Sequence, residues 1–263
     1  MGDRVTVAYH DGSGWQGLSP SPSQGILGSL DDTVTLSFDA TQPYVAFSGS
    51  STSMVANVHV ATWDGAAWGE VGDPGYLSPC MMHFHLDLAM DGATPHLATF
   101  GAGGCGSGTG YTWFDGSDWQ EHPSTTGFHG QICLDSVGHP AIVFTDQAYV
   151  GTAAAGTSTL ESTHAMKWWD AGNGEWADLV SELDMDAGTG NDEPLAAVSD
   201  AAGNIVVAWA EVMPTGMVNA HEIYVKRYDV TTDAWSLVGT GKASGDGDAN
   251  EPSVTLIGGH IWL

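Results

Sequence analysis

Short stretches in which apolar and polar residues alternate recur along the whole chain, and each one stops at a group of turn-forming residues. Examples are residues 5–9, 58–63 and 223–228, each followed by an Asp-containing turn and then by a tryptophan. Alternation with a period of two is typical of a β-strand with one buried face, and two such strands around an Asp-Gly turn predict a β-hairpin. We therefore expect a chain of the all-β class, built from hairpins.

The turn and its tryptophan form a repeated phrase. Three tight copies start at Asp11, Asp64 and Asp115, and two looser copies start at Asp170 and Asp229. The tryptophans that close the copies stand at positions 15, 68, 119, 176 and 235, so one period spans about 50 residues. A second hairpin precedes each of the last four copies, which gives four strands per period. This pattern is typical of a β-propeller blade, and we expect the five tryptophans to pack between blades.

The repeat predicts a single β-propeller domain over residues 1–263. Four blades of four antiparallel strands are expected at residues 30–72, 82–122, 129–180 and 191–240. The chain starts on the third strand of a period and ends on the first two, so residues 1–20 and 250–263 complement each other. We therefore expect five blades, with the ring closed by C-terminal inner strands plus N-terminal outer strands, which leaves no unpaired inner edge. The alternative is a fragment of a longer repeat array.

The phrase that runs from Asp64 to Trp68, and its counterparts, resembles the Trp-containing repeats of small secreted bacterial β-propellers. More distantly, the chain resembles the tachylectin-like five-bladed lectins. The turn is also similar to the Asp-box of sialidase-like propellers, although Asp and Trp are one residue closer together in the three tight copies. The double glycines of kelch repeats and the Trp-Asp ending of WD40 blades are missing. The resemblance implies the fold and says little about ligand or reaction.

The charge of the chain restricts its partners. Five Lys and Arg residues stand against 32 Asp and Glu residues, which gives a formal net charge of −27. Nucleic acids and anionic membranes bind clustered basic residues, so we expect neither as a partner. No apolar run approaches the roughly 18 residues of a membrane-spanning helix.

The three cysteines bear on the compartment. Cys80 and Cys105 are expected in two loops on the same face of one blade, which would allow a disulfide between them. Cys133 falls in an inner strand, where a small buried core residue is more common than a ligand. An acidic chain with one candidate disulfide fits an extracellular or periplasmic protein. No signal peptide is visible, so we expect its leader to have been removed, and an intracellular protein is the alternative.

Candidate ligands gather where each innermost strand is expected to start. His83 and His85 stand two apart on one predicted strand, so we expect both to point the same way, and His129, Gln131 and Cys133 share this parity on the neighbouring blade. Imidazole nitrogens suit Zn or Cu, and neighbouring methionines favour Cu. The carboxylates would instead suit Ca, so a Cu, Zn or Ca ion is the expected cofactor. The candidate metal ligands are His83, His85, His129, Asp32, Asp192, Glu193 and Glu251.

Several functions remain open at this point. The first is a secreted metal-binding propeller with a histidine-containing site at the mouth of the channel, with or without chemistry at the metal. The second is an enzyme on the same face, either a metal-assisted hydrolase or oxidase or a glycosidase that uses a carboxylate pair such as Asp32 and Glu193. The third is a lectin-like carbohydrate-binding module, and the fourth a passive scaffold. A metal ion and a glycan or other small molecule are the expected partners, while the oligomeric state is left undetermined.

Overall fold

A computed structural model of residues 1–263 provides the fold. It describes residues 5–18, 21, 30–50, 56–72, 77–80, 82–102, 108–125, 127–150, 159–180, 183, 195–215, 218–244, 249 and 251–263. Within these residues every regular element is a β-strand. No helix in this described part is long and apolar enough to cross a membrane. The chain divides into two compact units, residues 1–124 and 125–263.

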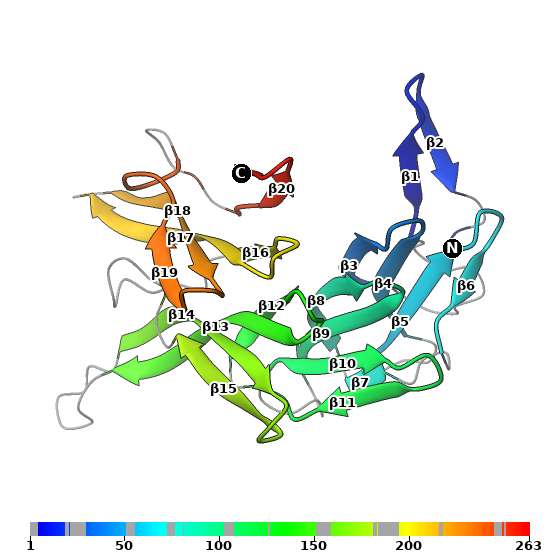
Figure 1. The fold of residues 1–263 in the computed structure, drawn as a ribbon, viewed down its shortest axis with the longest axis horizontal. Coiled ribbons are helices and arrows are strands. Elements are labelled where there is room, and N and C mark those ends of the chain that lie inside the picture. The colour runs from blue at the N-terminus through cyan, green and yellow to red at the C-terminus, as the bar shows by residue number, and fades with distance from the viewer. Residues whose placement is uncertain are drawn as a thin grey trace. The chain divides into compact units, whose positions relative to one another are not determined.

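The first unit holds two antiparallel sheets and an N-terminal hairpin (Figure 1). One sheet has the strand order β3-β4-β5-β6, with the short strand β7 also paired to β5, and the other has the order β8-β9-β10-β11. The sequence did not predict β7. The strands are β1 (Val7–His10), β2 (Trp15–Leu18), β3 (Leu30–Phe38), β4 (Pro43–Ser50), β5 (Ala56–Trp63), β6 (Trp68–Glu70), β7 (Leu77–Cys80), β8 (Met82–Asp91), β9 (Thr94–Ala102), β10 (Gly110–Phe114) and β11 (Trp119–His122).

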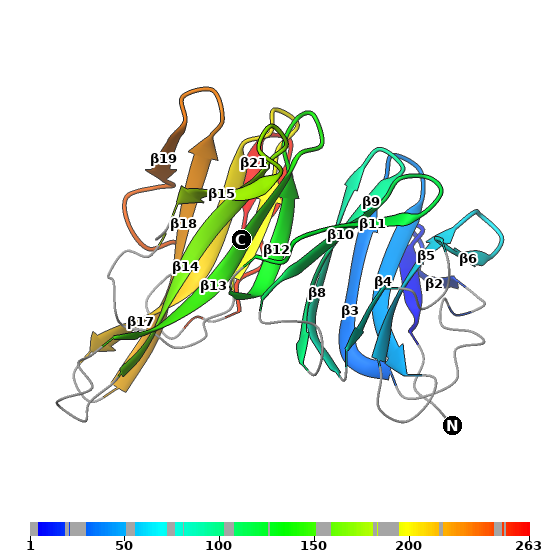
Figure 2. The ribbon, with the colours of Figure 1, turned by 90° about the horizontal axis from the view of Figure 1, so that it is seen from below.

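The second unit repeats this plan. Its sheets have the orders β12-β13-β14-β15 and β16-β17-β18-β19, and Figure 2 shows the two packed against each other. Consecutive strands pair in antiparallel fashion throughout, so the predicted four-stranded antiparallel sheets are confirmed. The strands are β12 (Phe128–Leu134), β13 (Pro140–Val150), β14 (Thr159–Asp170), β15 (Glu175–Val180), β16 (Leu195–Ser199), β17 (Ile205–Thr215), β18 (Val218–Asp229), β19 (Ala234–Leu237), β20 (Thr255–Ile257) and β21 (His260–Trp262).

Eight of the described hairpin turns share one arrangement, in which an aspartate carboxylate caps the turn. In the β10–β11 turn, Oδ1 of Asp115 accepts the backbone N–H groups of Ser117 and Asp118, both at 2.9 Å. Gly116, between Asp115 and Ser117, has φ +96°, a left-handed conformation that glycine adopts without steric cost. The side chain thus satisfies amide groups that the tight turn leaves without backbone partners, which explains why the Asp recurs. The other seven capping residues are Asp11, Asp39, Asp64, Asp135, Asp170, Asp200 and Asp229.

The same hydrogen bonds favour the ionised carboxylate. In Asp115, the N–H groups of Asp118 and Ser117 lower the pKa to about 2. In Asp11, the hydroxyl and backbone N–H of Ser13 and the N–H of Gly14 lower the pKa to about 2. Asp115 and Asp11 are therefore charged at neutral pH and contribute to the acidity of the chain.

Tryptophans of the repeated phrase pack where neighbouring sheets meet. In the first unit, Trp119 belongs to the second sheet, and its indole N–H donates to the carbonyl of Val71, which follows β6 of the first sheet, at 2.9 Å. In the second unit, Trp235 packs against the core shared by both sheets, beside Tyr228. The predicted role of these two tryptophans is confirmed. Trp15 lies in the two-stranded sheet β1–β2 and is 74% exposed there. Its packing between blades requires closure of the fifth blade and stays a prediction.

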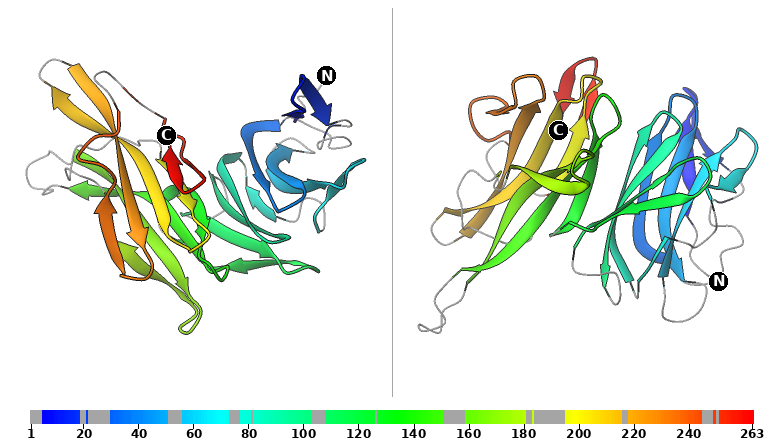
Figure 3. Two further views of the ribbon diagram at one scale, coloured as in Figure 1. Left: turned by 45° about the horizontal axis from the view of Figure 1, so that its top comes forward. Right: turned by 60° about the horizontal axis from the view of Figure 1, so that its bottom comes forward.

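Two short hairpins correspond to the two halves of the expected fifth blade. β1–β2 and β20–β21 each form a two-stranded sheet. Within the second unit, Leu256 and Ile261 of β20–β21 pack against Val206 and Ala208 of β17, as Figure 3 shows for the red hairpin beside the yellow strands. Closure of a blade by residues 1–20 with 250–263 stays a prediction, as does the single-domain organisation.

Candidate functional site

The first strand of each four-stranded sheet borders the first strand of the next sheet in the same unit. β3 lies beside β8 in the first unit, and β12 lies beside β16 in the second. Because successive sheets repeat the same strand order, these neighbouring strands run in the same direction. The starts of the inner strands, where the sequence predicted the site, therefore lie together within each unit.

Three of these four strands break their regular pairing close to their start. In β3 the register with β4 shifts between Leu30 and Val34, and in β8 the register with β9 shifts between His83 and His85. In β12 the register with β13 shifts between Phe128 and Gln131. Extra residues in one strand bend it and re-aim its side chains, and such bulges are concentrated next to active sites. The shifts coincide with the predicted site residues in all three strands.

The shift in β8 changes the expectation for its two histidines. His83 is paired with Gly101 and His85 with Phe100, so Phe84 is an extra residue between them. The regular alternation that would turn both histidines the same way is therefore interrupted. The side chain of His85 is half-buried, whereas that of His83 lies outside the described residues.

In the second unit, the histidine at the start of β12 has an unusual backbone. His129 has φ +55°, a left-handed conformation that is uncommon for a residue other than glycine. Such conformations persist where the surrounding structure enforces them, often at functional sites. Cys133, four residues further along β12, is 1% exposed in the apolar core, so its predicted role as a core residue is confirmed.

The candidate carboxylates are only partly described. The backbone of Asp32 belongs to β3, but its side chain lies outside the described residues, as do Asp192 and Glu193 entirely. Glu251 precedes β20, is exposed and has φ +54°. Among the described residues no group of three or more His, Cys, Asp and Glu side chains is placed to hold a metal ion. The proposed metal ligands and the Cys80–Cys105 pair, whose Cys105 also falls outside the described residues, stay predictions.

A buried polar group lies between the two sheets of the second unit. The indole N–H of Trp209 on β17 donates to Glu211 Oε2 at 3.4 Å. The ring centroid of His164 on β14 lies 6.2 Å from that of Trp209. His164 is 3% exposed and Glu211 is 4% exposed. Their burial makes both residues part of the contact between the sheets.

The first unit contains a second buried histidine. His96 on β9 forms a 2.6 Å hydrogen bond through Nδ1 with the hydroxyl of Tyr111 on β10. Its Nε2 has no hydrogen-bond partner among the described residues. Burial lowers the pKa of His96 to about 4, because the imidazolium form would be poorly solvated there. The residue is therefore neutral at physiological pH.

No protein-family model and no curated protein matches this chain. Solved structures do match. One is a thermostable family-43 glycoside hydrolase, 9% identical with a TM-score of 0.51, over 88% of this chain and 82% of that one. Another is an α-L-arabinofuranosidase from Fusarium graminearum in complex with an iminosugar inhibitor, 11% identical with a TM-score of 0.51, over 96% of this chain and 76% of that one. These neighbours confirm the β-propeller fold that the repeat predicted.

Proposed function

We propose that this protein is a carbohydrate-active β-propeller that acts on a neutral glycan at the starts of its inner strands. The observation that carries the proposal is the coincidence of three register shifts with acidic and histidine residues at these starts. Support comes from the fold, which the chain shares with a family-43 glycoside hydrolase and an α-L-arabinofuranosidase.

Cleavage of a glycosidic bond needs two carboxyl groups. One protonates the leaving oxygen, and the other either activates a water molecule or attacks the sugar directly. We propose Asp32, at the start of β3, as one such carboxyl group in the first unit, and Glu193, which shortly precedes β16, as one in the second unit.

The charge of the strand starts favours a neutral substrate. Residues 31–33, 83–85, 129–131 and 192–194 include acidic residues and histidines but no Lys or Arg. An acidic polysaccharide would meet repulsion there without a cation to bind its carboxylates. Neutral pentose and hexose polymers meet no such penalty.

The test is release of reducing ends from a panel of neutral polysaccharides that includes arabinan, arabinoxylan, galactan and β-glucan. We expect wild type to act on at least one, and Asp32→Asn and Glu193→Gln each to lower kcat by about 100-fold or more. The exposed residues Asp118 and Glu121 provide matched controls, and Asp118→Asn and Glu121→Gln should leave kcat unchanged. Equal rates in all four variants would refute the assignment.

A protein that only binds glycans would give a different result. It would be retarded in gels that contain the polysaccharide, and it would release no reducing ends. Such a result would favour the lectin-like alternative, since the repeat resembles that of the tachylectin-like lectins. Neither retardation nor release on any neutral glycan would overturn the proposal.

The histidines support a second candidate, a metal site at the strand starts of one unit, with His83 and His85 as ligands in the first unit or His129 in the second. The left-handed backbone of His129 at a register shift is the observation that favours it. Elemental analysis of protein purified without a tag or chelator should find near-stoichiometric Cu or Zn in wild type, and loss of the metal in the His83→Ala/His85→Ala variant. If the variant retains bound Ca, the ligands are the carboxylates and not the histidines. If wild type contains none of the three metals, the metal site is excluded.

A further inference from the structure

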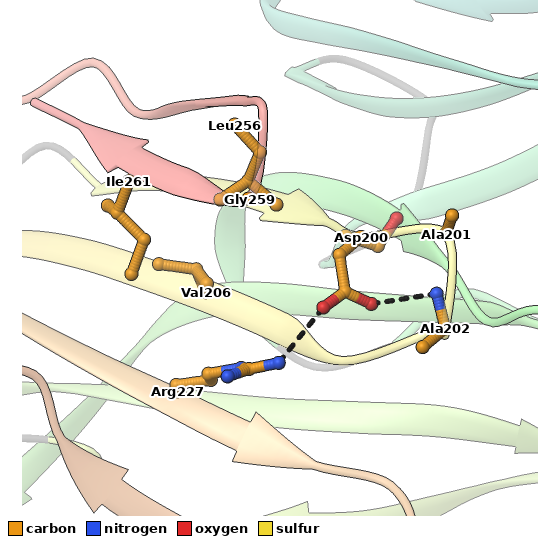
Figure 4. Close-up of a pocket in the computed structure, with 9 residues that line it drawn as sticks. Asp200, Ala201, Ala202, Val206, Arg227, Leu256, Gly259 and Ile261 are labelled. Carbon is orange, nitrogen blue, oxygen red and sulfur yellow. Dashed lines mark hydrogen bonds and ion pairs between the residues drawn. The ribbon is translucent and has the colours of Figure 1, made fainter.

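The second unit contains a cavity of about 530 Å³ at the opposite end of β16 from its start. Its walls come from three separate segments: the β16–β17 hairpin with Asp200 and Val206, the Arg227 side chain of β18, and the hairpin β20–β21 (Figure 4). The register shifts lie at the starts of the inner strands, so this cavity is a different place from the site proposed above.

Both oxygens of the Asp200 carboxylate accept hydrogen bonds from neighbouring residues at the cavity. Its Oδ1 accepts the backbone N–H groups of Ala202 at 2.9 Å and Asn204 at 3.0 Å. Its Oδ2 accepts the side-chain amide of Asn204 at 2.9 Å and Nη2 of Arg227 at 3.0 Å. Four hydrogen bonds occupy the four lone-pair directions of a carboxylate. Asp200 therefore orients Arg227 and has no acceptor left for a ligand.

Arg227 retains most of its capacity to donate. A guanidinium carries five N–H groups in a planar fork, and in the described part of the chain one of them is used, by Asp200. The side chain is 43% exposed, and in Figure 4 it borders the cavity beside Val206. Arg227 is one of only two arginines in the sequence, so this donor is unusual in so acidic a chain.

The opposite wall is apolar. It consists of Leu256 and Ile261, which are half-buried and pack against the cluster that contains the buried Val206. A ligand in this cavity would therefore contact the N–H donors of the Arg227 guanidinium on one side and aliphatic side chains on the other. A carboxylate matches a guanidinium fork in charge and geometry, whereas a hydroxyl both donates and accepts.

We propose that this cavity binds a small organic carboxylate with an apolar ring face, of which a uronic acid sugar is the clearest case. The carboxylate pairs with the remaining N–H groups of Arg227, and the ring C–H face lies on Leu256 and Ile261. Asp200 acts as a positioning residue for the guanidinium. This binding activity is independent of the glycan chemistry proposed for the inner strand starts.

The direct probe is sodium glucuronate, with glucose as the neutral analogue. The chain has two arginines, so ¹⁵N labelling of arginine gives two Nε–H signals, and Arg227→Gln identifies that of Arg227. We expect glucuronate to shift this signal saturably and glucose to leave it in place. Equal shifts with both sugars, or no shift with glucuronate, would overturn the proposal.

Three variants complete the test, and their melting temperatures show whether each is folded. Ala201 lies on the exposed turn at the cavity, so Ala201→Trp fills the cavity without altering Asp200 or Arg227 and should weaken glucuronate binding at least about tenfold. Arg227→Gln should lower affinity to the same extent, as followed by ligand-observed NMR. Lys242→Gln removes one positive charge elsewhere in the unit, where Lys242 pairs with Glu222, and should leave binding unchanged. Unaltered binding in folded Ala201→Trp would refute the location.

Discussion

Replacement of Gly203 by alanine tests how neighbouring sheets pack in the second unit. Gly203 lies in the β16–β17 turn with φ +84°. A Cβ atom at this position would lie 2.6 Å from the backbone nitrogen of Ser136 and 3.2 Å from Cα of Asp135, both in the β12–β13 turn of the neighbouring sheet. The contact is with backbone, which cannot rotate away as a flexible side chain would.

Two effects add in Gly203→Ala. The left-handed conformation costs a residue with a Cβ about 1–2 kcal/mol, and forcing an extra methyl group into a packed contact costs about 1–3 kcal/mol. The free energy of unfolding should therefore fall by about 2–5 kcal/mol, a large share of the roughly 5–15 kcal/mol that stabilises a typical domain.

Gly174→Ala is the matched control. Gly174 has φ +71° in the β14–β15 turn, and a Cβ there would meet no atom within 4 Å. This variant should lose only the conformational part, about 1–2 kcal/mol. Urea unfolding followed by tryptophan fluorescence gives both values from the shift in midpoint at constant slope. If the two variants lose the same free energy, the turns of the two sheets do not touch as described, and the reasoning is refuted.

Three further predictions concern single side chains. Trp119→Phe removes the N–H that donates to Val71 and should cost about 1–2 kcal/mol, whereas Trp119→Ala should cost about 3–5 kcal/mol in urea unfolding; equal losses would contradict this. The pKa of Asp115 is about 2 in the folded protein against an ordinary value of 3.8, so the stability that its carboxylate contributes is complete above pH 3.8 and is lost as the pH falls towards 2. In Asp115→Asn, the melting temperature should therefore fall less steeply over this pH range than in wild type. The folded pKa of His96 is about 4 against 6.5, so the unfolded state takes up the proton first and stability should fall by about 3 kcal/mol as the pH drops from 6.5 to 4. His96→Gln should remove most of this slope, and an unchanged slope would show that His96 is not the responsible group.

The hairpins could be predicted from the sequence because their chemistry is local. An Asp that caps the amides of the next few residues, followed by a glycine with positive φ, specifies a tight turn wherever it occurs. Asp115 and Gly116 show this directly. The burial of Cys133 could be predicted for a similar reason, since a small apolar side chain in an inner strand is usually part of the core.

Packing depends on partners that the local sequence does not reveal. Trp15 and Trp119 belong to nearly identical turns, yet one is exposed and the other buried, because only Trp119 has a neighbouring sheet to cover it in its unit. A repeat therefore predicts the element more reliably than the environment of each residue.

The irregular pairing at the start of β8 could not be predicted from the sequence. The expectation that His83 and His85 face the same way assumed regular alternation, and the extra residue Phe84 looks like any other apolar strand residue. The cavity at Arg227 was missed for another reason. Its walls come from residues around positions 200, 227 and 260, which no spacing rule connects.

The central claim, that the starts of the inner strands bind a neutral glycan, is tested most directly by a crystal structure with a bound neutral oligosaccharide. The predicted result is sugar density against the residues that begin β3 and β8, or against those that begin β12 and β16, and loss of that density in Asp32→Asn or Glu193→Gln crystals. Sugar density only at the hairpin turns, or only at the Arg227 cavity, would contradict the claim.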